Sequence, residues 1–149
     1  MRSFIIISLV FLLTSCKARL EEAQNLTCPD TVTLQYDYRN RTGSIPVNKK
    51  LKSFTVYFIG SYNDDIEVFV NGKLYYHKHL NIDDNHDNLN DFFDYNYSED
   101  TELPILKIKS KTKETCFDIH IKEKYKILYV FLSERGEWIV RFSNLHYLN

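Results

Sequence analysis

The 149-residue chain lacks most of the features that mark the common enzyme and nucleic-acid-binding classes. It has four glycines and no glycine-rich phosphate loop, and it contains no HExxH motif, no GxSxG motif and no Cys–His nucleophile pattern. The 19 basic and 20 acidic residues nearly balance, which argues against nucleic acid as a partner. We therefore do not expect an enzyme. The alternative is a secreted hydrolase-like enzyme whose carboxylate site is assembled wholly by tertiary structure.

Strong helix formers are scarce as well. No alanine follows Ala23, whereas aromatic residues make up 15% of the chain, which favours strands. Alternation of apolar and polar residues with period two recurs along the sequence. Residues 28–149 are thus predicted to form a single-domain, all-β, antiparallel β-sandwich of about seven or eight strands, with a small β-barrel as the alternative. Outside two hairpins, strands are expected at residues 31–38, 54–59, 103–108 and 116–121.

The first hairpin covers residues 66–82 and offers two registers. A two-residue loop would place Val68 opposite Tyr75 and mix the two faces. A three-residue loop over residues 70–72 instead places Val68 opposite Leu74 and gathers apolar side chains on one face. We predict the three-residue loop.

The second hairpin covers residues 125–142. A loop at residues 134–136 sets Leu132 opposite Trp138, so that Trp138 anchors a face directed toward the core. The outer face of this hairpin is only partly polar, with Tyr129, Phe131, Ile139 and Arg141. Such a face is either covered by another segment or exposed as a contact surface.

One long apolar run stands at the N-terminus. Arg2 precedes the apolar stretch at residues 4–13, which is too short to span a bilayer. Small residues then lead into a cysteine, in the order Leu13-Thr14-Ser15-Cys16. This pattern resembles the signal peptide and lipobox of bacterial lipoproteins.

The resemblance implies that residues 1–15 are removed and that Cys16 is acylated. Residues 16–27 then form a lipidated, polar tether to the lipid bilayer, either at the outer face of the cytoplasmic membrane or at the outer membrane. Loss of Arg2 leaves 18 basic and 20 acidic residues, a formal charge of −2. The alternative is ordinary secretion with cleavage after Ala18.

Two cysteines, Cys28 and Cys116, remain in the mature chain. In an exported protein a disulfide between them is the simplest expectation. It would contribute roughly 4–5 kcal/mol in the chain-entropy model and tie the start of the domain to a late strand. The alternative is a pair of free, buried thiols.

An acidic stretch without Lys or Arg covers residues 83–102. Five of its oxygen-bearing side chains fall at offsets 1, 3, 5, 9 and 12, which resemble the ligand positions of an EF-hand loop: Asp83, Asn85, Asp87, Asp91 and Asp94. Calcium is the one cofactor that this pattern indicates. A solvated acidic loop between strands is the favoured interpretation, because no amphipathic helix flanks the stretch.

Two other groups of polar residues alternate along expected strands. His77 and His79 project from one face near His86, which indicates either a solvated pair or a zinc site. The lysines at positions 107, 109, 111 and 113 share a solvent face, where they discourage edge pairing or bind an anion.

These observations favour a non-catalytic binding or accessory role in the cell envelope. The expected contact surface consists of the exposed aromatic residues Tyr75, Tyr129 and Phe131. Its partner would be a protein or a glycan. A calcium-stabilised carbohydrate-binding module is a further alternative.

Overall fold

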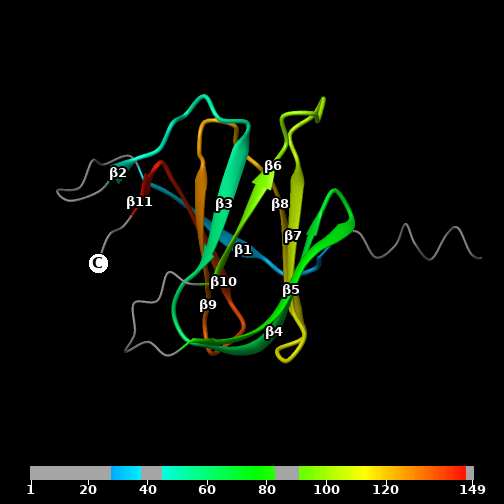
Figure 1. Ribbon diagram of the computed structural model, residues 1–149. Coiled ribbons are helices and arrows are strands. Elements are labelled where there is room, and N and C mark those ends of the chain that lie inside the picture. Colours follow the sequence, from blue (N-terminus) through cyan, green and yellow to red (C-terminus); the bar gives the residue numbers. More distant parts are fainter. Residues whose placement is uncertain (1–27, 38–44, 83–90, 147–149) are drawn as a thin grey trace, which may run out of the picture.

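The computed structural model describes residues 28–37, 45–82 and 91–146 (Figure 1). Within these ranges every regular element is a strand, and no helix is long and apolar enough to cross a membrane. The strands are β1 (Val32–Tyr36), β2 (Ile45–Pro46), β3 (Ser53–Phe58), β4 (Tyr62–Val70), β5 (Lys73–Ile82), β6 (Phe92–Asn96), β7 (Ile105–Ser110), β8 (Thr115–His120), β9 (Ile127–Leu132), β10 (Trp138–Ser143) and β11 (Leu145–His146).

Nine of these strands form two sheets that face each other (Figure 1). The five-stranded sheet has the order β1-β10-β9-β3-β6, and the four-stranded sheet has the order β5-β4-β7-β8. The short strands β2 and β11 pair with each other as a separate ribbon. The predicted all-β sandwich is therefore confirmed.

The direction of the strands differs in part from the expected antiparallel arrangement. The pairs β1–β10 and β3–β9 are parallel, whereas all other pairs are antiparallel among the described residues. A hairpin must be antiparallel, but strands that are distant in sequence can pair in either direction. Alternation in the sequence carries no information on that choice.

The core lies between the two sheets and follows the period-two pattern of the strands. On β3, Phe54, Val56 and Phe58 are buried while the residues between them turn outward. Aromatic side chains join the sheets, as where the Phe117 and Trp138 rings meet edge to face at 5.1 Å. Full burial of one such large side chain contributes about 1.5–3 kcal/mol.

The β9–β10 hairpin has the predicted register. Leu132 pairs with Trp138, and the strands continue in step to the Ile127–Ser143 pair. Gly136 in the loop has φ of +82°, a conformation that glycine adopts without strain.

The predicted register of the β4–β5 hairpin is wrong. Its loop has two residues, Asn71 and Gly72, with φ values of 50° and 76°, as a type I′ turn requires. A β-bulge follows, so Val68 lies opposite Tyr76 rather than Leu74. The bulge places Tyr76 opposite Val68, but the next residue of this face, Ile66, lies opposite Lys78 and not opposite Tyr76 as expected.

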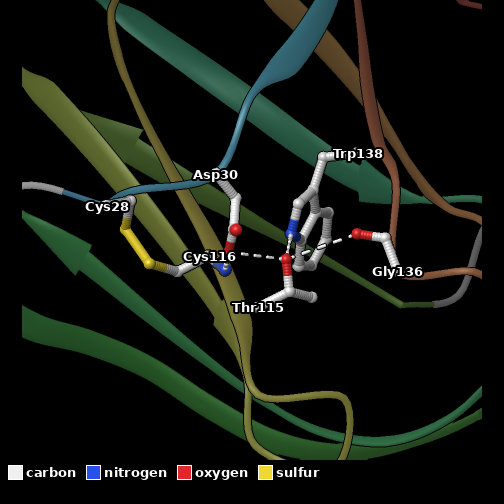
Figure 2. The surroundings of a disulfide bond; sticks show 6 residues. All are labelled: Cys28, Asp30, Thr115, Cys116, Gly136 and Trp138. Atoms are coloured by element: carbon white, nitrogen blue, oxygen red, sulfur yellow. Dashed lines mark hydrogen bonds between the residues drawn. A yellow bond between two sulfur atoms is a disulfide. The ribbon is translucent and has the colours of Figure 1, made fainter.

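A disulfide joins Cys28 to Cys116 on β8, with a Cα–Cα distance of 5.4 Å, as predicted (Figure 2). The Asp30 carboxylate accepts hydrogen bonds from the Cys116 N–H at 3.0 Å and from the Thr115 hydroxyl at 2.9 Å. Trp138 donates its indole N–H to the same hydroxyl at 3.2 Å. Both hydrogen bonds lower the pKa of Asp30, and the bond from the Cys116 N–H has a larger effect than the bond from the Thr115 hydroxyl.

Candidate binding surface

One row of cross-strand neighbours crosses the outer face of the five-stranded sheet. It runs from β6 to β1 through Phe92, Tyr57, Tyr129, Arg141 and Gln35. The adjacent residues along these strands point into the core, so the row points away from it. We call these five residues the outer row.

The aromatic rings of the outer row pack against one another and are partly exposed. The Tyr57 ring lies 5.4 Å from Phe92 and 5.6 Å from Tyr129, measured between ring centroids. Phe92 is 45% exposed, whereas Tyr129 is buried. Burial, with the nearby Asp94 charge, raises the pKa of Tyr57, which keeps its hydroxyl neutral at physiological pH.

The polar half of the outer row is tied together by Arg141. Its Nε and Nη2 atoms donate to the side-chain oxygen of Gln35 at 3.0 and 2.9 Å. The guanidinium carbon also lies 5.4 Å from the centroid of the Phe131 ring, in a cation–π contact. These contacts hold Arg141 on the sheet and fix one end of the row.

Strand β11 covers the middle of the outer row. The Tyr129 hydroxyl donates to the Leu145 carbonyl at 2.9 Å, and the His146 ring meets Tyr57 edge to face at 6.2 Å. Among the described residues of the outer row, the rings that remain open to a ligand are those at the β6 side, Phe92 and part of Tyr57.

Polar groups lie beside these open rings. Thr55 and Asp94 are paired across β3 and β6, two residues along from Tyr57 and Phe92, and the Thr55 hydroxyl donates to the Asp94 carboxylate. Two residues along a strand correspond to roughly 7 Å. The flat apolar ring can contact an apolar face of a ligand. The hydroxyl and the carboxylate beside it can bind hydroxyl groups of the same ligand.

The structure separates the three residues that were expected to form one contact surface. Tyr75 is 48% exposed, but its hydroxyl donates to the Asp94 carbonyl at 2.7 Å and its ring packs on Tyr95 of β6. Phe131 lies on β9 and is half-buried beside Arg141 of β10. Strand β3 lies between β9 and β6, so it separates Phe131 from the β6 residues that Tyr75 contacts. The expected exposure of Tyr129 is wrong, because β11 covers it.

Sequence reasoning missed Phe92 and Tyr57. Both occupy outward positions of their strands, and alternation alone identifies Tyr57 as such a position. What the sequence does not reveal is that the parallel pairing of β3 with β9 and the antiparallel pairing with β6 bring these rings side by side.

Of the five expected calcium ligands, Asp83, Asn85 and Asp87 lie outside the described residues. Asp91 forms an ion pair with Lys78, and Asp94 accepts the Thr55 hydroxyl. Within the described ranges, no group of three or more His, Cys, Asp or Glu side chains could hold a metal ion.

Of the histidines and lysines singled out in the sequence, His77, His79, Lys107 and Lys109 lie on the four-stranded sheet, and Lys111 and Lys113 lie in the turn between β7 and β8. His77 and His79 are exposed, the His79 Nδ1 atom lies 3.0 Å from an Asp65 carboxylate oxygen, and His86 is outside the described residues. Lys111 pairs with Glu67, and this bond to Glu67 raises the pKa of Lys111. The lysines at positions 107 and 109 lie opposite acidic residues of the neighbouring strands, Asp118 and Glu67.

No protein-family model, no curated protein and no solved structure matches this chain.

Proposed function

We propose that the protein is a lipid-anchored, non-catalytic binding protein of the bacterial cell envelope, and that its ligand is a glycan that contacts the open rings of the outer row. The observation that carries the proposal is Phe92, which is 45% exposed and whose ring packs at a tilt against Tyr57. Together with the half-buried Tyr57, Phe92 forms a small apolar surface next to polar groups.

The chemistry of the surface favours a sugar over an apolar peptide. Pyranose rings present a flat face of C–H groups that stacks on aromatic rings, and their hydroxyl groups need hydrogen-bond partners. Thr55 and Asp94 offer a hydroxyl and a carboxylate beside Phe92. The rings lie on regular strands, so little order must be gained on binding.

Co-sedimentation with insoluble polysaccharides tests the glycan proposal, with peptidoglycan sacculi, chitin and cellulose as probes. We expect Phe92→Ala to weaken retention about tenfold, since loss of one stacking contact costs about 1–3 kcal/mol. Leu74→Ala is the matched control, because Leu74 is 56% exposed but lies on the four-stranded sheet. If the two variants were retained equally, the outer row would not be the glycan-binding site. Failure of the unmutated protein to bind any of the three probes would count against a glycan ligand.

The lipid anchor is supported by the Leu13-Thr14-Ser15-Cys16 order after an apolar run. The expected mature protein begins at Cys16 and carries a diacylglycerol, which intact-mass measurement detects. Cys16→Ser should abolish both cleavage at this point and the lipid mass. A mature protein that begins after Ala18 without lipid would instead establish ordinary secretion.

A further inference from the structure

Two basic turns lie together at one end of the sandwich (Figure 1). The turn before β3, residues 47–52, carries three exposed lysines and no acidic residue, and the turn before β9, residues 122–126, carries two exposed lysines and Glu123. We call the five exposed lysines of these turns the basic end: Lys49, Lys50, Lys52, Lys122 and Lys124.

Asn144 holds the two turns side by side. Its backbone carbonyl accepts the Val47 N–H at 2.9 Å, and its side-chain Nδ2 donates to the Lys124 carbonyl at 2.7 Å. Its side-chain oxygen also accepts the Lys126 N–H at 3.0 Å. The hydrogen bonds of Asn144 therefore hold the two lysine-bearing turns next to each other.

The lysines of the basic end differ from those of the four-stranded sheet. Within the described part of the chain none of the five forms an ion pair, and Lys124 instead lies 5.1 Å from the centroid of the Tyr125 ring. Lys111, directly after β7, in contrast forms an ion pair with Glu67. The basic end therefore keeps its positive charge available for an external anion.

An apolar side chain stands among these charges. Leu51 is 50% exposed, lies between Lys50 and Lys52 in sequence, and donates its N–H to the Asn48 carbonyl at 3.3 Å. Lysines that flank an exposed apolar residue suit the boundary of a membrane, where the leucine enters the interface and the ammonium groups meet lipid headgroups. A soluble polyanion would make no use of Leu51.

The length of the chain before the domain allows this contact. Residues 17–27 connect Cys16 to Cys28, so the span is at most about 40 Å. A domain of about 120 residues has a radius of gyration of about 14 Å. Because Cys28 is fixed beside β8 by the disulfide, either end of the sandwich lies within reach of a bilayer that holds Cys16.

We propose that the basic end faces the membrane, with its lysines on anionic lipid headgroups and Leu51 in the interface. The proposal rests on the lipid anchor of the proposed function. The connection between β6 and β7, which carries Glu99, Asp100 and Glu102, lies at the same end of the sandwich (Figure 1). The outer row then faces sideways and stays accessible.

Tryptophan fluorescence of the acylated, full-length mature protein on vesicles tests this orientation. The one native tryptophan, Trp138, is buried and supplies a constant background. We expect the added tryptophan of Leu51→Trp to shift its emission to the blue on phosphatidylglycerol vesicles and to be quenched by doxyl-labelled lipid, but not on phosphatidylcholine vesicles. Leu74→Trp, at an equally exposed leucine of the other sheet, should show neither change. Equal responses at the two positions, or none at position 51, would overturn the proposal.

A charge-matched pair of variants tests the lysines. In the Leu51→Trp background, Lys49→Gln with Lys50→Gln should lower the ratio of docked to undocked domain about 25-fold, because each lysine near an anionic surface contributes about fivefold. Lys73→Gln with Lys109→Gln removes the same charge elsewhere and should leave quenching unchanged. Salt should weaken docking as the Debye length shortens. Equal losses in the two variants, or a response to heparin but not to the vesicles, would contradict a membrane-facing basic end.

Failure of the anchor is a separate outcome. Retention on phosphatidylcholine vesicles, together with the diacylglycerol mass, reports the anchor alone. The change between the two lipids reports the basic end alone.

Discussion

The two sides of the sandwich, where edge strands of the two sheets meet, are closed by different chemistry. At the β1–β8 side a disulfide and the Asp30 carboxylate join the first strand to the other sheet (Figure 2). At the β5–β6 side the closure is aromatic: Tyr76 and Phe93 pack at 5.2 Å, and Tyr75 and Tyr95 at 5.0 Å.

The difference follows from how much apolar surface each side buries. Phe93 is 7% exposed and Tyr76 is half-buried, so the β5–β6 side is held by burial. Strand β1 has five residues and none is fully buried, with Leu34 38% exposed. This strand buries little apolar surface to offset its conformational entropy, and the covalent bond lies close to its start.

Loss of the disulfide should have the largest effect on this comparison. Cys28→Ala with Cys116→Ala opens a loop with a sequence separation of 88 residues, and we expect it to lower the free energy of unfolding by about 4 kcal/mol. Urea unfolding followed by Trp138 fluorescence measures the change. A reductant should destabilise the unmutated protein to a similar extent and leave the double variant unchanged. If the reductant left the urea midpoint of the unmutated protein unchanged, the disulfide would not be the main contact that joins the two sheets on this side.

The aromatic side is tested by two neighbouring phenylalanines. Phe93→Ala removes a buried ring that contacts Phe58 and Tyr76, and it should cost about 3 kcal/mol of stability. Phe92→Ala removes the outward-pointing ring of the neighbouring residue and should lower the free energy of unfolding by about 1 kcal/mol or less. Urea unfolding compares the two. Similar costs would show that the β5–β6 side is not held by inward burial.

The same contrast explains what the sequence could predict. In the β9–β10 hairpin the apolar pattern and Gly136 agree on one register, and the structure has that register. In the β4–β5 hairpin, Asn71 adopts a positive φ in a two-residue loop. A β-bulge after the Phe69–Leu74 pair then changes which residues of β5 lie opposite those of β4. A pattern rule that allows no bulge therefore selects the wrong loop.

The candidate surface was harder to predict than the fold. Tyr129 is outward on its strand, but a two-residue strand covers it, and Leu145–His146 is too short to show a periodic pattern. The stacking of Tyr57 on Tyr129 depends on a parallel pair of strands about 70 residues apart in sequence. Local alternation determines the face of a side chain, whereas tertiary pairing determines its neighbours.

A smaller change should strengthen the aromatic side. The Tyr76 hydroxyl is buried and has no hydrogen-bond partner among the described residues, and burial raises its pKa to about 12. Tyr76→Phe removes this unsatisfied group but keeps the ring, so we expect stability to rise by about 1 kcal/mol. Thermal and urea unfolding both report the gain. A loss of stability would mean that the hydroxyl has a partner in the folded protein.

The smallest effect is expected from the carboxylate at the covalent side. Its hydrogen bonds to the Cys116 N–H and the Thr115 hydroxyl lower the pKa of Asp30 in the folded protein below its ordinary value of 3.8. The unfolded chain therefore binds the proton more readily, so the contribution of Asp30 to stability is present above the unfolded pKa and is lost as the pH falls through the folded pKa.

Asp30→Asn removes this titration. The difference in urea midpoint between the unmutated protein and the variant should be constant near neutral pH and shrink below about pH 4. The effect is small because Asp30 is exposed to solvent, which screens its charge. A difference that persists unchanged into acid would mean that the carboxylate holds β1 by shape and not by charge, and that the disulfide alone distinguishes this side from the aromatic one.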